Sequence, residues 1–517
     1  MSDDGGGGSR HRRPSRRPPK FLVVGLLIAV GGAVGGIAVY RSISDDAATS
    51  TTAGQPSPTS ASTRPAPAAA PPSAPSAPSA PATLVPALSE PALWQRTLAA
   101  ATPLLTPQPL DALTPTPATL LSALGPLLAD PAFAGDDVAM VIRDAATGRL
   151  LFDHNGADAD VPASTAKLAV AVAALQVLGP DAHLTTAVVA GATPHAVVLV
   201  GGGDPTLAGP KAIGPYSPGY PAPASLSDLA SQTATHLRAG GVASVSVGYD
   251  VSLFAGPTAS VGWKPIYYTE GDVAPVTALE VDEGRADLTK PARSLAPAAV
   301  AAADFAALLT ANGITVVGSP TPAHAAKGAT TLGRVSSPSI SGLVQRMLSR
   351  SDNDIAEALA RQVAIATGGQ GTFAGAAQAV KAAVTALGVP PAGFAMVDAS
   401  GLSPSDRLPP TVLAQLVWLA VAPGQPRLAS IAAALPVAAF SGTLGGRFSG
   451  SAAAGAGVVR AKTGTLDGVV SLAGYVVSAS GEPLVFAVIA NKVRTTATVI
   501  TEAALDRVVA GLVTVGP

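Results

Sequence analysis

Three short motifs stand in a fixed order along this 517-residue chain and constrain its fold more than any other feature. They are Ser164-Thr165-Ala166-Lys167, Ser351-Asp352-Asn353 and Lys462-Thr463-Gly464. Of the nine lysines, only Lys167 has a serine three positions before it, and of the four asparagines, only Asn353 has a serine two positions before it. Each motif is therefore unique here, and we expect one fold to bring three distant segments together.

The first motif opens an alanine-rich helix. Residues 168–175 are all apolar and Gly179-Pro180 follows, which predicts a buried helix with a clear end. Residues three apart share a helical face, so Ser164 lies beside Lys167 at the positive end of the helix dipole. A lysine can activate a serine only if burial or a nearby cation keeps it neutral. We expect Ser164 to be the nucleophile and Lys167 its general base; alone, the pair also fits a helix start followed by a solvated lysine.

The second motif lies between two apolar helical segments, 343–348 and 355–364. The simpler interpretation is that Asp352 or Asn353 caps the second helix. The functional interpretation is that Ser351 relays a proton to the leaving amine, while the Asn353 side chain bonds to Lys167 and to a substrate amide. The two interpretations are compatible.

The third motif lies in a strand-like segment, 458–465, and two further strands, 469–477 and 484–491, precede a final helix from about residue 499. This pattern predicts antiparallel strands packed against a helix. A lysine on an edge strand can simply prevent aggregation. In a catalytic site, Lys462 would help to keep Lys167 neutral, and Gly464 would let a substrate backbone approach the strand.

The hydroxyls near the third motif are suited to anion binding. Thr463 and Thr465 lie on one face of the predicted strand and can donate to a substrate carboxylate. The backbone N–H groups of Ser164 and Thr465 are candidate donors for an oxyanion hole.

The N-terminus predicts a membrane location. Residues 1–20 are basic, with six Arg and Lys side chains from Arg10 to Lys20, and residues 21–40 carry no charge. Twenty residues of helix cover about 30 Å, the thickness of a bilayer core. Cationic flanks stay inside, so we expect a single-pass cell membrane protein with residues 1–20 in the cytoplasm and the rest outside. Export after signal cleavage is the alternative.

Composition limits the remaining possibilities. Residues 41–117 are rich in Pro, Ala, Ser and Thr, which predicts a disordered tether. Charged residues are only 13% of the chain and the net charge is −1, so nothing indicates a nucleic-acid partner. The chain has no cysteine, which excludes disulfides and thiolate metal sites. The motifs require no metal and no cofactor.

The contexts of the motifs carry a family resemblance. The chain resembles the low-molecular-mass penicillin-binding proteins, specifically the D-alanyl-D-alanine carboxypeptidase/endopeptidase group with extra sequence between the first two motifs. The matching segments, over roughly residues 118–515, are Pro162–Leu168, Gly201–Leu207, Ser351–Asn353 with Ala356-Glu357, Ser400–Ser403, Gly442–Leu444 and Ala461–Leu466.

The resemblance implies an α/β (α+β) fold of the penicillin-binding and β-lactamase-like transpeptidase type, with an antiparallel sheet flanked by helices. We expect a catalytic domain at 118–205 and 336–517. A single α/β insert is expected at 206–335, with a helix at 226–239, a strand at 244–251 and a helix–strand pair across 298–317. The glycines at 201–203 are expected to form a turn rather than a phosphate site, because Lys211 lies outside the P-loop spacing.

The resemblance further implies a serine DD-peptidase. Ser164 would attack the D-Ala-D-Ala bond of a peptidoglycan stem peptide, and β-lactams would acylate the same serine. Lys167 would be the base, Ser351 and Asn353 would relay and position, and Lys462, Thr463 and Thr465 would bind the carboxylate.

Two alternatives remain, a serine β-lactamase and a catalytically vestigial scaffold that binds the cell wall. Against the first, Glu357, the only glutamate between Ser351 and Lys462, follows the second motif too closely to resemble a separate deacylation loop. Whether the enzyme acts as carboxypeptidase or endopeptidase is left open by the sequence.

Overall fold

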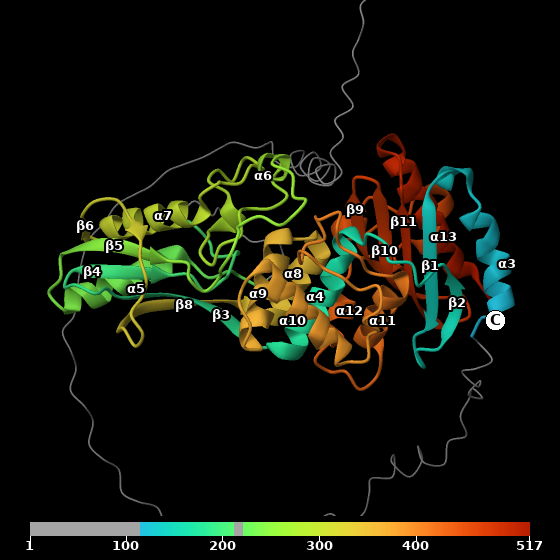
Figure 1. Ribbon diagram of the computed structural model, residues 1–517, viewed down its shortest axis with the longest axis horizontal. Coiled ribbons are helices and arrows are strands. Elements are labelled where there is room, and N and C mark those ends of the chain that lie inside the picture. Colours follow the sequence, from blue (N-terminus) through green and yellow to red (C-terminus); the bar gives the residue numbers. More distant parts are fainter. Residues whose placement is uncertain (1–113, 211–220, 517) are drawn as a thin grey trace, which may run out of the picture. The chain divides into compact units, whose positions relative to one another are not determined.

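The structure is a computed structural model that describes residues 114–210 and 221–516. A five-stranded sheet forms the centre of one part, in the order β2-β1-β11-β10-β9, and every neighbouring pair is antiparallel (Figure 1). Its strands are β1 (Asp137–Asp144), β2 (Leu150–His154), β9 (Arg460–Leu466), β10 (Val469–Val477) and β11 (Pro483–Asn491). The N-terminal hairpin of β1 and β2 and the three predicted C-terminal strands therefore join in one sheet.

Helices cover both faces of this sheet, and the side chains of β11 alternate between them. Val485, Ala487 and Ile489 pack into the core shared with α4 and α11, while Phe486 and Val488 pack into the core shared with α13. Both faces of the sheet are buried at β11, so apolar side chains follow one another along this strand without alternating with polar ones. The helices on the two sides are α3 (Pro117–Leu128) and α13 (Thr498–Thr514) on one, and α4 (Lys167–Val177), α8 (Ile340–Arg350), α9 (Asn353–Ala366), α10 (Phe373–Thr385), α11 (Pro410–Val421) and α12 (Ala429–Ala434) on the other.

A second, mixed sheet has the order β6-β5-β4-β3-β8, with β7 (Thr321–Pro322) beside β5. Its strands are β3 (His183–Ala190), β4 (Ala196–Val200), β5 (Ser244–Asp250), β6 (Thr315–Val316) and β8 (Thr331–Ser339). Helices α5 (Leu226–Ala239) and α7 (Pro297–Ala311) pack on it, and the short α6 (Ile266–Glu270) follows β5. The limits of the insert stay a prediction. In this sheet β3 and β4 precede residues 206–335, β5 to β7 lie within them, and β8 crosses the predicted end.

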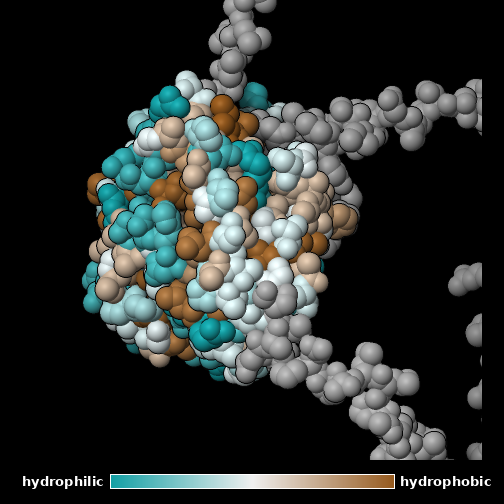
Figure 2. Space-filling model, turned by 90° about the vertical axis from the view of Figure 1, so that its right-hand side faces the viewer, coloured by the Kyte–Doolittle hydropathy of each residue, from teal (hydrophilic) through white to brown (hydrophobic). Residues whose placement is uncertain are grey.

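The surface near α3 and α13 is mixed in character. Figure 2 shows hydrophilic and hydrophobic residues interspersed over this face. Large apolar side chains that are exposed in the described part of the chain include Leu121, Val499 and Ile500. Single apolar residues of this kind are ordinary on protein surfaces.

The prediction of a single-pass membrane protein is wrong for the structure as described. Within residues 114–210 and 221–516, no helix is both long and apolar enough to cross a bilayer. A span needs about 20 consecutive apolar residues, whereas α13, the longest of these helices, has 17 residues. The predicted basic segment 1–20, the membrane segment 21–40 and nearly all of the tether 41–117 lie outside the described residues. We therefore assign no membrane location.

Candidate active site

The first motif begins in a strained turn before α4. A 3₁₀ turn, Ala163–Ala166, holds Ser164, and Lys167 is the first residue of the α-helix. Ala163 has φ +48°, a conformation that costs a non-glycine residue free energy and is common at functional sites. A Cβ at Gly401 would collide with the Ala163 carbonyl, so only glycine lets the 400–403 turn approach the nucleophile this closely.

The Lys167 amine has three neighbours, and their chemistry fixes its orientation. It donates to Asn353 Oδ1 at 2.6 Å and to the Ser400 carbonyl oxygen at 2.6 Å, while Ser164 Oγ lies at 2.9 Å. Amide and carbonyl oxygens can only accept. A neutral amine has two N–H groups and one lone pair, so these two acceptors take both hydrogens and the lone pair points at the Ser164 hydroxyl. This is the geometry that a general base requires.

Burial makes the neutral form of Lys167 accessible. The side chain is wholly buried, and the loss of hydration lowers its pKa to about 8. Four carboxylates act in the opposite direction and favour the ammonium form; they belong to Asp398, Asp352, Glu357 and Asp354. Burial is the larger effect.

The second motif joins α8 to α9 as predicted. Ser351, at φ +60°, ends α8, and Asp352 caps α9 by accepting from the Ile355 N–H at 3.0 Å. The Asn353 side chain bridges two parts of the chain, because its Oδ1 accepts from Lys167 and its Nδ2 donates to the Asp272 carbonyl at 2.8 Å. The capping role and the contact with Lys167 therefore occur together.

The third motif presents a second buried amine. Lys462 Nζ donates to Ser351 Oγ at 3.0 Å and to the Thr463 carbonyl at 2.7 Å. Burial is the main reason that its pKa falls well below the ordinary value, and the charge of Lys167 adds to the effect. The strand that carries it, β9, is at the edge of the sheet, so part of its backbone is not paired with β10.

The glycine of the third motif is required by the packing of the protein itself. A Cβ at Gly464 would lie 3.1 Å from the Ser164 nitrogen and would collide with Ser471 Oγ. The closeness of β9 to the nucleophile turn thus depends on this glycine. The expected approach of a substrate backbone at Gly464 stays a prediction.

The predicted carboxylate-binding hydroxyls both have partners within the protein. Thr463 Oγ1 donates to Thr443 Oγ1 at 2.7 Å, and Thr465 Oγ1 donates to Glu502 Oε1 at 2.8 Å. Neither partner was expected from the sequence. Thr443 lies in one of the segments that carried the resemblance, whereas Glu502 lies in the final helix and has no sequence signature.

A buried glutamate holds the turn that orients Lys167. Glu357 Oε1 accepts from the Ala399 and Ser400 N–H groups, each at 2.9 Å, and Oε2 accepts from Arg361 Nη1 at 3.0 Å. This contact presents the Ser400 carbonyl to Lys167. In the sequence, Glu357 was weighed as a deacylation base. In the structure its partners are backbone amides and an arginine.

Fold and site together define a serine hydrolase of the penicillin-binding type. A model of the D-Ala-D-Ala carboxypeptidase 3 (S13) family matches residues 120–294 and 287–512. The chain therefore belongs to the D-Ala-D-Ala carboxypeptidase 3 (S13) family. This confirms the family resemblance and the prediction of a serine-type D-Ala-D-Ala carboxypeptidase within the low-molecular-mass penicillin-binding proteins.

Two curated relatives support this assignment. The chain is 38% identical over 402 residues to carboxypeptidase DacB of Mycolicibacterium smegmatis, which covers 76% of this chain and 84% of the relative. It is 39% identical over 388 residues to carboxypeptidase Rv3627c of Mycobacterium tuberculosis, covering 74% and 81%.

A solved structure supports the fold. Penicillin-binding protein 4 of Haemophilus influenzae is similar with a TM-score of 0.62 at 20% identity, over 78% of this chain and 100% of that one. The predicted α/β fold with an antiparallel sheet flanked by helices is confirmed.

Proposed function

We propose that Ser164 forms an acyl-enzyme with stem peptides that end in D-Ala-D-Ala. The observation that carries the proposal is the lone-pair geometry at Lys167, with Ser164 Oγ 2.9 Å from Nζ and both other neighbours able only to accept. Lys167 takes the hydroxyl proton as Ser164 Oγ bonds to the penultimate D-Ala carbonyl carbon. The backbone N–H groups of Ser164 and Thr465 would stabilise the resulting oxyanion.

The leaving amine needs a proton, and a relay is available. Ser351 Oγ accepts from Lys462 Nζ at 3.0 Å, which leaves its own hydroxyl hydrogen to donate to a substrate. We propose that Ser351, held by its hydrogen bond from Lys462, passes a proton to the departing D-Ala nitrogen as the C–N bond breaks, and that the Lys167 ammonium formed in the first step replaces that proton and becomes neutral again. A water molecule, activated by the neutral Lys167, then cleaves the ester and releases the shortened peptide.

Substrate recognition is assigned to β9. We propose that Asn353 Nδ2 contacts the substrate amide with its second hydrogen. The Thr463 and Thr465 hydroxyls, together with Lys462, would face the C-terminal carboxyl group, and the backbone at Gly464 would pair with the peptide. A β-lactam presents a carbonyl and a carboxylate to the same groups, so we propose that β-lactams acylate Ser164 too.

The proposal extends to the domain plan. We propose that residues 118–205 and 336–517 make up the catalytic part and that residues 206–335 form the insert. Helices α5 and α7 and strand β5, which lie within residues 206–335, share a hydrophobic core that is separate from the two cores of the five-stranded sheet, which supports this division.

Mass spectrometry tests the nucleophile directly. Incubation with penicillin should add one drug mass to the protein, on the peptide that contains Ser164, and Ser164→Ala should stay unmodified. The same variant should not release D-Ala from a D-Ala-D-Ala peptide. An unmodified wild-type protein, or an adduct that persists in Ser164→Ala, would refute the assignment.

A further inference from the structure

We infer that a segment of the predicted insert, residues 271–293, positions the catalytic amide of Asn353. Asn353 Nδ2 donates to the Asp272 carbonyl, which can only accept, so the amide oxygen must face Lys167. A rotated amide would present N–H hydrogens to Lys167. The lysine lone pair would then turn to Asn353 and away from Ser164, and the base would be lost.

Two contacts hold the Asp272 carbonyl in place, one on each side of it. Arg293 Nε donates to the Gly271 carbonyl at 3.1 Å, and the Ala274 N–H donates to Asp354 Oδ1 at 2.7 Å. Arg293 Nη2 also lies 3.4 Å from Asp354 Oδ2. The guanidinium thus links the segment of the insert to the residue that follows Asn353.

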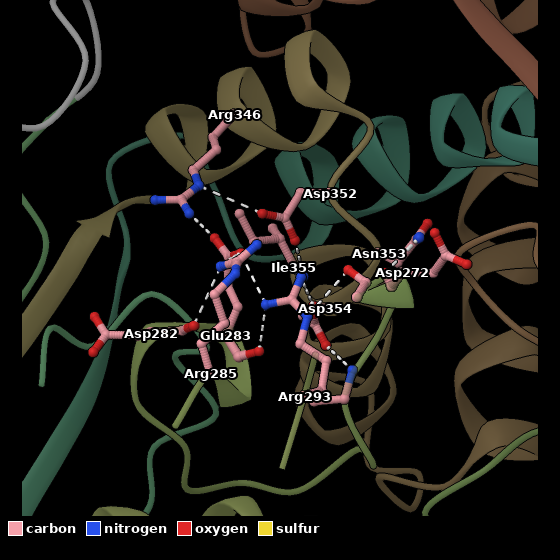
Figure 3. Close-up of polar contacts among 12 residues, drawn as sticks. Asp272, Asp282, Glu283, Arg285, Arg293, Arg346, Asp352, Asn353, Asp354 and Ile355 are labelled. Atoms are coloured by element: carbon pink, nitrogen blue, oxygen red, sulfur yellow. Dashed lines mark hydrogen bonds and ion pairs between the residues drawn. The ribbon is translucent and has the colours of Figure 1, made fainter. Parts of the chain in front are cut away.

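A buried ionic cluster fixes the position of Arg293 (Figure 3). Its Nη1 donates to the Glu283 carbonyl at 2.6 Å, and Glu283 also pairs with Arg346 and Arg285. Arg346 Nε in turn lies 3.4 Å from Asp352 Oδ2. The Arg293 side chain is only 4% exposed. Buried, mutually bonded charges of this kind hold one geometry, because each unpaired alternative leaves a charge without compensation.

Arg293 and the Asp272 carbonyl are therefore positioning groups for the proposed reaction, on which this inference rests. A matched pair of variants separates positioning from stability. Arg293→Lys keeps the charge but loses the planar fork that reaches the Gly271 carbonyl and Asp354 together. Arg285→Lys makes the same change at another partner of Glu283, one whose side-chain hydrogen bonds go to Asp282 and Glu283 instead of to Gly271.

The readout is the rate of penicillin acylation per titrated active site, with folding followed by circular dichroism. We expect Arg293→Lys to slow acylation about tenfold to a hundredfold, as misplacement of a catalytic group does, and Arg285→Lys to stay within about twofold of wild type. Wild-type acylation in a folded Arg293→Lys, or equal losses in both variants, would overturn the inference. Failure of the wild type to react would instead refute the proposed function.

Discussion

Two lysines lie wholly buried in one site, yet their surroundings differ. Lys167 touches the Ser164 hydroxyl and two oxygens that only accept, and four carboxylates oppose the effect of burial on its pKa. No carboxylate of the residues that the structure describes opposes the effect of burial on the pKa of Lys462, and its neighbours are a serine hydroxyl and a backbone carbonyl. The two lysines therefore differ in their hydrogen-bond partners and in the charges that act on their pKa values.

The difference teaches how the site divides its proton chemistry. With a pKa of about 8, Lys167 exchanges its proton near neutral pH, which suits a group that must take and return one. Burial and then the charge of Lys167 lower the pKa of Lys462, and we expect this amine to act through its hydrogen bonds to Ser351 and the Thr463 carbonyl. The sequence suggested instead that Lys462 would supply positive charge.

The largest effect is expected at Lys167. Lys167→Met removes the base but keeps a long apolar stem in the buried site, so we expect folding to survive. Penicillin acylation of Ser164 should fall by roughly three orders of magnitude, the range that general bases contribute. Stopped-flow measurement with a fluorescent penicillin gives the rate. A loss of less than tenfold would mean that another group takes the Ser164 proton.

A smaller loss is expected at Lys462. Lys462→Met removes the donor to Ser351 Oγ and leaves the Thr463 carbonyl without this bond. We expect acylation to slow by about tenfold to a hundredfold, as for the loss of one or two catalytic hydrogen bonds. The same assay compares it with Lys167→Met, and equal losses would contradict the division of roles.

The sequence predicts the side chains of this site better than it predicts the backbone groups that orient them. Side-chain patterns predict the three motifs, the buried helix after Ser164 and the strands β9 to β11. The Ser400 and Asp272 carbonyls orient Lys167 and Asn353, but every residue has a carbonyl, so no residue type marks them. Glu357 was noticed for its charge, while its partners, backbone amides at 399 and 400, are set only by the tertiary fold.

The second sheet shows the same limit. Its helix at 226–239 and strand near 244 follow from local periodicity. The pairing of β3 with β8 joins residues 183–189 to residues 331–339, which cross the predicted end of the insert, and such long-range register is decided by packing rather than by a local pattern.

The pH profile gives the finest test of the comparison between the two lysines. Protonated Lys167 cannot accept the Ser164 proton, so the acylation rate should rise about tenfold per unit at low pH and level off above about 8. A carboxylate favours the ammonium form, and its removal therefore lowers the pKa of Lys167. Asp352→Asn removes one such charge and keeps a side chain that caps α9 equally well.

We therefore expect Asp352→Asn to move the midpoint of the profile to lower pH, by a few tenths of a unit to about one unit. Asp287→Asn is the control. Asp287 is exposed and is not one of the four carboxylates that act on Lys167, so this variant should leave the midpoint unchanged. A midpoint that stays in place or rises in Asp352→Asn would show that the titrating group is not Lys167. The shift of the midpoint reports only on charge near Lys167. We therefore expect Lys462→Met to slow the reaction without shifting the midpoint.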